Sequence, residues 1–221
     1  MNAQRNVRES VMTQKTAKEL LEGAYALGSA KDNVDYYADF AAVYDEGFAS
    51  DLGYQSPRMI AEYLAEVGSD AMQIADIGCG TGLIADHLPG HQIDGYDISP
   101  EMIEVAREKG LYREFYCADL TGDLSALPDD YDALISAGTF TMGHLDAGHL
   151  LGLLALLKHN AWVAVTISQA HFDKAGFGDA LNAALKNGLI TKPEFREFSI
   201  YQKAGHDHSS DKGWLTRFQK A

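Results

Sequence analysis

Three glycines at alternate positions, Gly78, Gly80 and Gly82, follow a short apolar run and an acid, Asp76. A buried strand that ends in a tight glycine turn and opens a helix is the simplest interpretation. Glycine adopts positive φ without steric cost and lets a ligand approach the bare backbone. The first N–H groups of a helix bind carboxylate or phosphate. The stretch therefore predicts a loop that binds a small charged ligand.

Two acidic residues limit the kinds of ligand that this loop is expected to bind. The fingerprint of nicotinamide-dependent dehydrogenases is G-x-G-x-x-G, whereas here the third glycine comes one residue early. Asp76 before the loop suits a ligand with an ammonium group and opposes a pyrophosphate. Asp97 ends a second strand pattern, 93–97, at the place where a βαβ unit holds ribose hydroxyls. A nucleoside that carries an ammonium group fits this pattern.

The segments Asp76-Ile-Gly-Cys-Gly-Thr-Gly82 and Tyr96-Asp97-Ile-Ser resemble the first two motifs of the class I S-adenosylmethionine-dependent methyltransferases. The resemblance implies that S-adenosyl-L-methionine is the cofactor and S-adenosyl-L-homocysteine the product. It places the methionine moiety at Asp76 and the glycine loop, and the ribose at Asp97. The implied cofactor-binding residues are Tyr36, Tyr44, Asp76, Gly78, Cys79, Gly80, Gly82, Asp97, Ile98, Asp119, Leu120, Ser136 and Ala137.

Two of these assignments compete with structural roles. By the resemblance, Asp119 and Leu120 take the adenine, but aspartate is also common in turns. The tyrosine-rich stretch with Tyr36-Tyr37 and Tyr44-Asp45 resembles the segment that covers the cofactor in many small-molecule methyltransferases. The same stretch also fits an amphipathic helix that packs on the domain.

His144 is the catalytic candidate, because it follows the fourth predicted strand, where the acceptor is expected to approach. It could act as a general base if the methyl acceptor must lose a proton. The alternative is a structural histidine that caps the next helix. His206 and His208 lie on a polar loop and make a poor metal site, so no metal is predicted.

The composition and charge of the chain indicate which binding partners are unfavourable. The chain has 221 residues and a formal net charge of −14, without any cluster of lysines and arginines. Nucleic acid and anionic membranes are therefore unfavourable partners, and a small-molecule acceptor is expected. The charge alone also fits a role in solubility. There is no apolar run long enough to span a membrane and no signal peptide, and the two cysteines form no disulfide framework, so a cytoplasmic location is expected.

The pattern of predicted strands and helices around these residues indicates an α/β fold. We expect a doubly wound, Rossmann-like sheet of seven strands with a C-terminal antiparallel hairpin. One domain is expected over 1–221, with a helical lid at 1–50 and a core at 51–221. Predicted strands are 72–77, 93–97, 112–117, 131–138, 162–167, 194–201 and 213–218. Predicted helices are 16–27, 37–44, 56–68, 83–88, 99–109, 147–157 and 177–187.

The subgroup resemblance is to the small methyltransferase-like proteins of the Williams–Beuren critical-region type. It rests on the N-terminal tyrosines, the Ser56-Pro57 helix start, Gly110-Leu-Tyr112 and residues 138–144. The K-P-G-G turn common in the wider family is replaced by Leu157-Lys-His-Asn-Ala-Trp162. No N/D-P-P-Y/F motif occurs, which argues against methylation of amide or exocyclic base nitrogens, and in-line transfer to O, N or C of a small molecule is expected. Three alternatives stay open: an aminopropyltransferase-like enzyme, a non-catalytic sensor of the cofactor, and a nicotinamide-dependent oxidoreductase.

Overall fold

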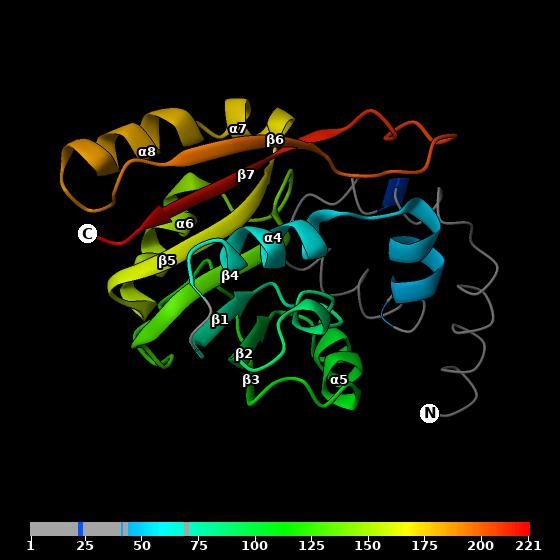
Figure 1. Ribbon diagram of the computed structural model, residues 1–221, viewed down its shortest axis with the longest axis horizontal. Helices are drawn as coiled ribbons and strands as arrows, with labels where there is room; N and C mark the ends of the chain where they lie inside the picture. The colour runs from blue at the N-terminus through cyan, green and yellow to red at the C-terminus, as the bar shows by residue number, and fades with distance from the viewer. Residues whose placement is uncertain (1–21, 24–40, 42–43, 69–70) are drawn as a thin grey trace.

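A seven-stranded sheet organises the computed structural model, which describes residues 22–23, 41, 44–68 and 71–221 (Figure 1). Its strand order is β3-β2-β1-β4-β5-β7-β6. Neighbours among the first five strands pair in parallel, and β7 is antiparallel to both β5 and β6. The strands are β1 (Gln73–Ile77), β2 (Gln92–Asp97), β3 (Glu114–Cys117), β4 (Tyr131–Phe140), β5 (Leu157–Ser168), β6 (Glu194–Ser199) and β7 (Lys212–Gln219). The predicted fold class and the C-terminal hairpin are confirmed.

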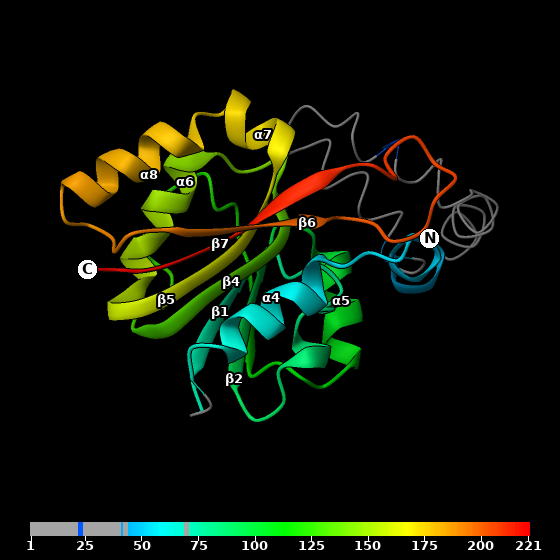
Figure 2. The same ribbon diagram turned by 45° about the horizontal axis from the view of Figure 1, so that its top comes forward.

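The helices lie on both faces of this sheet. They are α4 (Ser56–Ala65), α5 (Pro100–Glu108), α6 (Ala147–Gly152), α7 (Gln169–Lys174) and α8 (Phe177–Lys186), with 3₁₀-helices at Ala85–His87 and Leu153–Leu156. α4 packs on one face, while α6, α7 and α8 pack on the other (Figures 1 and 2). Within β1 the side chains alternate: Ile74 packs with α4, whereas Ala75 and Ile77 pack with the opposite layer. Burial on both faces explains why the strand is apolar along its length.

β1 and β4 are neighbours in the sheet, and the strand order reverses between them. From β1 the chain continues to β2 and β3 on one side, whereas from β4 it continues to β5 on the other side. In open α/β sheets the crevice at this point, outside the carboxyl ends of the strands, is where ligands bind. The glycine loop follows β1, Asp97 ends β2, and the segment with His144 follows β4. The topology therefore brings the chemically interesting residues to one edge.

The helix expected at 83–88 is wrong in extent, because only a 3₁₀ turn at Ala85–His87 forms. Gly78, Gly80 and Gly82 all have positive φ, and Gly90 does so again just after Pro89. Between Gly82 and Pro89 the chain forms this single 3₁₀ turn and no α-helix. The N–H groups of Gly78 and Cys79 donate to the Tyr96 carbonyl at 2.8 and 3.0 Å. These two N–H groups are therefore occupied within the protein, and the predicted anion contact at a helix start stays a prediction.

Side-chain caps begin the helices α5 and α6. Ser99 Oγ accepts a hydrogen bond from the Met102 N–H of α5 at 3.3 Å. Asp146 accepts one from the His149 N–H of α6 at 3.1 Å, and the His149 ring accepts the Asp146 N–H in return. Ser56 makes no such cap, since it is the first residue of α4 and not the residue before it. The helix predicted at 147–157 ends at Gly152 and continues as a 3₁₀ turn, and α7 was not predicted.

Most of the predicted lid lies outside the described residues, including Tyr36, Tyr37 and nearly all of the helix expected at 16–27. The described part of the lid is Ala41 and residues 44–50, where Asp45–Ser50 forms a π-helix. Across the described chain, no helix combines the length and apolar character needed to cross a membrane.

Candidate cofactor site

A cavity of about 180 Å³ lies at the carboxyl ends of β1, β2 and β4. It brings together nine of the residues predicted from the sequence: Tyr44, Gly78, Gly80, Asp97, Ile98, Asp119, Leu120, Ala137 and His144. Four others do not line it: Asp76, Cys79, Gly82 and Ser136. Ser136 is buried, and its hydroxyl donates to the Ile77 carbonyl at 2.7 Å.

The glycine loop forms the floor of this cavity, and its glycines have different roles. A Cβ on Gly78 would lie 2.0 Å from Thr139 Oγ1, so this glycine allows β4 to approach the loop closely. A Cβ on Gly80 would meet no atom within 4 Å. Gly80 therefore presents bare backbone to open space, which is the cradle that a ligand needs.

Asp97 is held in place by the loop it faces. One carboxylate oxygen accepts the Gly80 N–H at 2.8 Å, and the other accepts the Ser99 N–H at 2.9 Å. Burial raises the pKa of Asp97, and these backbone hydrogen bonds oppose the rise. Each oxygen retains a second lone pair that can accept a hydroxyl hydrogen. The geometry fits a ribose diol.

Asp76 lies beneath the loop and makes its contact away from the cavity. Its side chain is fully buried, and one oxygen accepts a hydrogen bond from the Tyr112 hydroxyl at 2.7 Å. The other oxygen has no hydrogen-bond partner among the described residues. Burial raises the pKa of Asp76 to about 7, although the Tyr112 hydrogen bond opposes this. The predicted contact with a methionine ammonium group stays a prediction.

Tyr112 is a supporting residue that sequence reasoning missed. Its ring lies against Gly82, where an added Cβ would come within 2.9 Å of the ring. Tyr112 therefore explains why the third loop position is glycine. The sequence contained the segment Gly110-Leu-Tyr112, but nothing in it indicated that the ring reaches Asp76 and Gly82.

Asp119 makes a local turn and also lines the cavity, and its predicted contact with the adenine stays a prediction. One oxygen accepts from the Thr121 N–H at 2.9 Å and from its hydroxyl at 2.7 Å, which makes a local turn. These bonds lower the pKa of Asp119. The same residue lines the cavity together with Ile98, Met102 and Leu120. An anionic acceptor beside apolar side chains is suitable for an adenine ring and its amino group.

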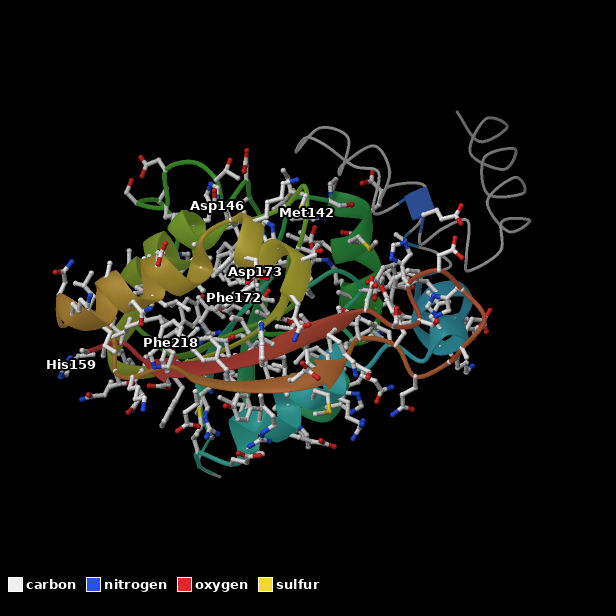
Figure 3. The ribbon with its side chains drawn as sticks, turned by 90° about the horizontal axis from the view of Figure 1, so that it is seen from above. Met142, Asp146, His159, Phe172, Asp173 and Phe218 are labelled. Atoms are coloured by element: carbon white, nitrogen blue, oxygen red, sulfur yellow. The ribbon has the colours of Figure 1, made fainter. Side chains whose placement is uncertain are left out.

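His144 lies in the segment between Met142 and Asp146, two residues that Figure 3 shows far from His159. Its Nδ1 donates to the Met142 carbonyl at 3.2 Å, so Nε2 is the acceptor nitrogen of the neutral ring. Burial lowers the pKa of His144 below its ordinary value of 6.5. The cap of α6 is made by Asp146 with His149, so His144 does not have that alternative role.

Asp45 attaches the described part of the lid to the glycine loop. Its carboxylate accepts a hydrogen bond from the Thr81 hydroxyl, and Lys109 Nζ lies 2.8 Å from its other oxygen. The neighbouring Tyr44 lines the cavity and stacks on Phe48 with ring centroids 5.0 Å apart. Neither Thr81 nor Lys109 was singled out in the sequence.

The residues present fit S-adenosylmethionine. Gly80 offers an open cradle, Asp97 offers two oriented carboxylate oxygens, and Asp119 offers a further acceptor at the apolar end of the same cavity. No group of three or more histidine, cysteine or acidic residues that could hold a metal occurs in the described ranges.

Comparison with known proteins agrees with this geometry. Residues 74–160 match the family model described as a methyltransferase domain. Human methyltransferase-like protein 27 is 27% identical over 172 residues, which are 75% of this chain and 69% of that protein. Over residues 74–160 the chain therefore resembles the class I S-adenosylmethionine-dependent methyltransferases.

Other relatives align over less of their length. The malonyl-[acyl-carrier protein] O-methyltransferase of Acetivibrio thermocellus is 34% identical over 46% of this chain and 39% of its own. An 18S rRNA (guanine-N(7))-methyltransferase of Bos taurus is 38% identical over 28% of this chain and 23% of its own. The fold is shared with a TehB-like methyltransferase of Corynebacterium glutamicum, with a TM-score of 0.59, 21% identity and coverage of 85% and 99%.

Proposed function

We propose that the protein transfers the methyl group of S-adenosylmethionine to a small-molecule acceptor. The observation that carries the proposal is the convergence of Gly80, Asp97, Asp119 and His144 on one cavity at the reversal point of the sheet. We assign the ribose to Asp97, the adenine to Asp119 with Leu120, and the methionine end to the glycine loop.

S-adenosylmethionine supplies a methyl group that its sulfonium already activates. The protein therefore has to align the acceptor and exclude water, and such positioning can lower a barrier by about 7–11 kcal/mol. Tyr44, which directly precedes the π-helix Asp45–Ser50, lines the cavity. His144 adds a neutral imidazole that can take a proton from the acceptor, worth about 10²–10⁴-fold in rate.

A small acceptor is favoured over RNA by charge. The net charge of −14 opposes a polyphosphate chain, and duplex or single-strand binders depend on lysine and arginine contacts. The likeness to an rRNA methyltransferase covers 28% of the chain. The subgroup assignment to methyltransferase-like protein 27 rests on 27% identity over 75% of the chain.

An aminopropyltransferase is the second candidate from the sequence, and it requires carboxylates that bind a polyamine. A second cavity, which adjoins the first at Tyr44, Gly138 and His144, has no carboxylate among its described lining residues. This observation favours methyl transfer.

Mass spectrometry of S-adenosylhomocysteine release tests the proposal directly. The purified protein is incubated with S-adenosylmethionine and panels of phenols, carboxylic acids, amines and thiols. We expect acceptor-dependent release with at least one panel. Saturable binding of S-adenosylmethionine without release from any panel would identify a sensor, and turnover of decarboxylated S-adenosylmethionine with putrescine would identify an aminopropyltransferase.

A further inference from the structure

A buried histidine of α7, His171, has no part in the proposed reaction. Its side chain is 7% exposed, and its ring packs edge to face on Phe177 with centroids 5.4 Å apart. Nε2 lies 2.9 Å from the Leu145 carbonyl, which can only accept a hydrogen bond, so Nε2 carries the proton and donates. Nδ1 has no hydrogen-bond partner among the described residues. The hydrogen bond of the ring therefore ends on the backbone of Leu145.

Packing alone does not require a histidine at this position. Burial of a polar group is unfavourable unless a hydrogen bond compensates it, and Nδ1 of His171 is buried without such a bond in the described part of the chain. An apolar side chain of similar size would fill the space beside Phe177 without that loss. The hydrogen bond to Leu145 is what distinguishes histidine from such a side chain. The role of His171 therefore depends on the segment that contains Leu145.

Leu145 belongs to the wall of the cofactor cavity. Residues 143–145 follow β4, and all three line this cavity. The Leu145 N–H donates to the Thr139 carbonyl of β4 at 3.2 Å, and the Leu145 carbonyl accepts from His171 at 2.9 Å. One backbone group of Leu145 thus joins the segment to β4, and the other joins it to α7. The position of this part of the cavity wall depends on both contacts.

His171 is itself fixed to the sheet. Ser168 ends β5 and caps α7, because its hydroxyl accepts the His171 N–H at 3.3 Å. Ser168 also pairs with Gly213 of β7 in the antiparallel register. Contacts therefore run without interruption from the sheet through the start of α7 to the cavity wall. A wall that is held in its binding conformation before the ligand arrives binds more tightly, because less chain has to be ordered on binding.

We infer that His171 is a positioning residue, which holds residues 143–145 in the conformation that binds the cofactor. The inference rests on the proposed function, because it takes S-adenosylmethionine as the ligand of this cavity. His171 does not line the cavity and acts through the backbone of Leu145. Without this hydrogen bond the segment can shift relative to the glycine loop, and binding of the cofactor then has to order it.

Two substitutions of matched shape test this role. Glutamine places an amide N–H near the position of Nε2, whereas methionine has a similar shape and no donor. We expect His171→Met to weaken binding of S-adenosylhomocysteine about tenfold in calorimetric titration, and His171→Gln to stay within about threefold of the wild type. If His171→Met does not fold, His171→Asn replaces it, because the shorter amide does not reach the Leu145 carbonyl.

Hydrogen exchange of the ligand-free protein provides a second measurement. The Leu145 amide should exchange faster in His171→Met than in the wild type, because the segment opens more often, and His171→Gln should restore its protection. This measurement reports on the segment itself and does not depend on which ligand the cavity binds.

Phe172→Leu is the control for a general loss of stability. Phe172 follows His171 on α7 (Figure 3), packs on Phe177 and Trp214, and lines neither cavity. Its substitution should lower the free energy of unfolding and leave the affinity for S-adenosylhomocysteine unchanged.

Three results would refute the positioning role alone: wild-type affinity in His171→Met, no recovery of binding in His171→Gln, or an equal loss of affinity in Phe172→Leu. Failure of the wild-type protein to bind S-adenosylhomocysteine would refute the proposed function and this inference together.

Discussion

The Tyr112 hydroxyl donates a 2.7 Å hydrogen bond to the buried carboxylate of Asp76, directly beneath the glycine loop. The pair connects the segment before β3 with the end of β1, and the tyrosine ring fills the space that Gly82 leaves open. The acid that precedes the glycines thus supports the loop from below.

The raised pKa of Asp76 predicts a pH-dependent stability. Its pKa is about 7 in the folded protein and 3.8 ordinarily, so folding favours the protonated form. This contribution is fully present below pH 4 and is lost as the pH rises to 7. The Asp76→Asn variant lacks this pH-dependent contribution. Between pH 4 and pH 7 the free energy of unfolding of the wild type should therefore fall relative to that of the variant by up to about 4 kcal/mol. Urea titrations at several pH values measure it, and a constant difference would contradict the prediction.

Two glycine substitutions should separate stability from ligand binding. Gly78→Ala forces a Cβ into Thr139, so we expect a loss of several kcal/mol of stability or failure to fold. Gly80→Ala meets no protein atom and should cost about 1 kcal/mol through its positive φ, yet weaken S-adenosylhomocysteine binding at least tenfold. Thermal unfolding and calorimetry measure the two effects. Unchanged affinity in Gly80→Ala would remove this glycine from the site.

Asp45 should link the lid to the cofactor cavity. Asp45→Ala removes the hydrogen bond from Thr81 and the ion pair with Lys109, so Tyr44 is held less firmly over the cavity. We expect about 1 kcal/mol weaker binding of S-adenosylhomocysteine, mainly through faster dissociation. Asp51→Ala, an exposed acid just beyond the same π-helix, is the matched control. Equal dissociation rates for both variants would argue against the link.

His144 should control the rate and its pH dependence. His144→Gln is expected to reduce kcat by about 10²–10⁴-fold for an acceptor that must lose a proton. Because burial lowers the pKa of His144, the wild-type rate should fall only below pH 6.5, where the imidazole becomes protonated. The variant should lack this acid limb. A pH profile of kcat that is the same in both proteins would exclude His144 as the base.

Much of the fold could be predicted because its signals are local. The apolar run before Gly78 and the Ser99-Pro100 pair each determine their own element, and β1 and α5 begin within one residue of the expected position. α7 was missed because Gln169–Lys174 is too short for a helical pattern. The helix after Gly82 was wrong in extent although its apolar spacing was present, because only a 3₁₀ turn forms between the positive-φ glycine Gly82 and Pro89.

The residues of the candidate site could be predicted where they belong to one sequence motif. They could not be predicted where the site depends on contacts between segments that are distant in the sequence. The glycine loop and Asp97 belong to one βαβ unit, and the cavity indeed contains both. The contacts of Tyr112 with Asp76, and of Asp45 with Thr81 and Lys109, connect residues more than thirty positions apart. Spacing along the chain contains no signal for such pairs, because packing alone brings them together.

The central claim is tested most directly by calorimetric titration of the protein with S-adenosylmethionine, S-adenosylhomocysteine and NADH. We predict saturable binding of both sulfur compounds and none of NADH. Asp97→Ala should weaken binding of S-adenosylhomocysteine by about 1–3 kcal/mol through the lost charged hydrogen bonds, whereas Glu104→Ala on the exposed face of α5 should not. Absence of binding by either sulfur compound, or equal affinity of Asp97→Ala and wild type, would contradict the assignment of this cavity to the cofactor.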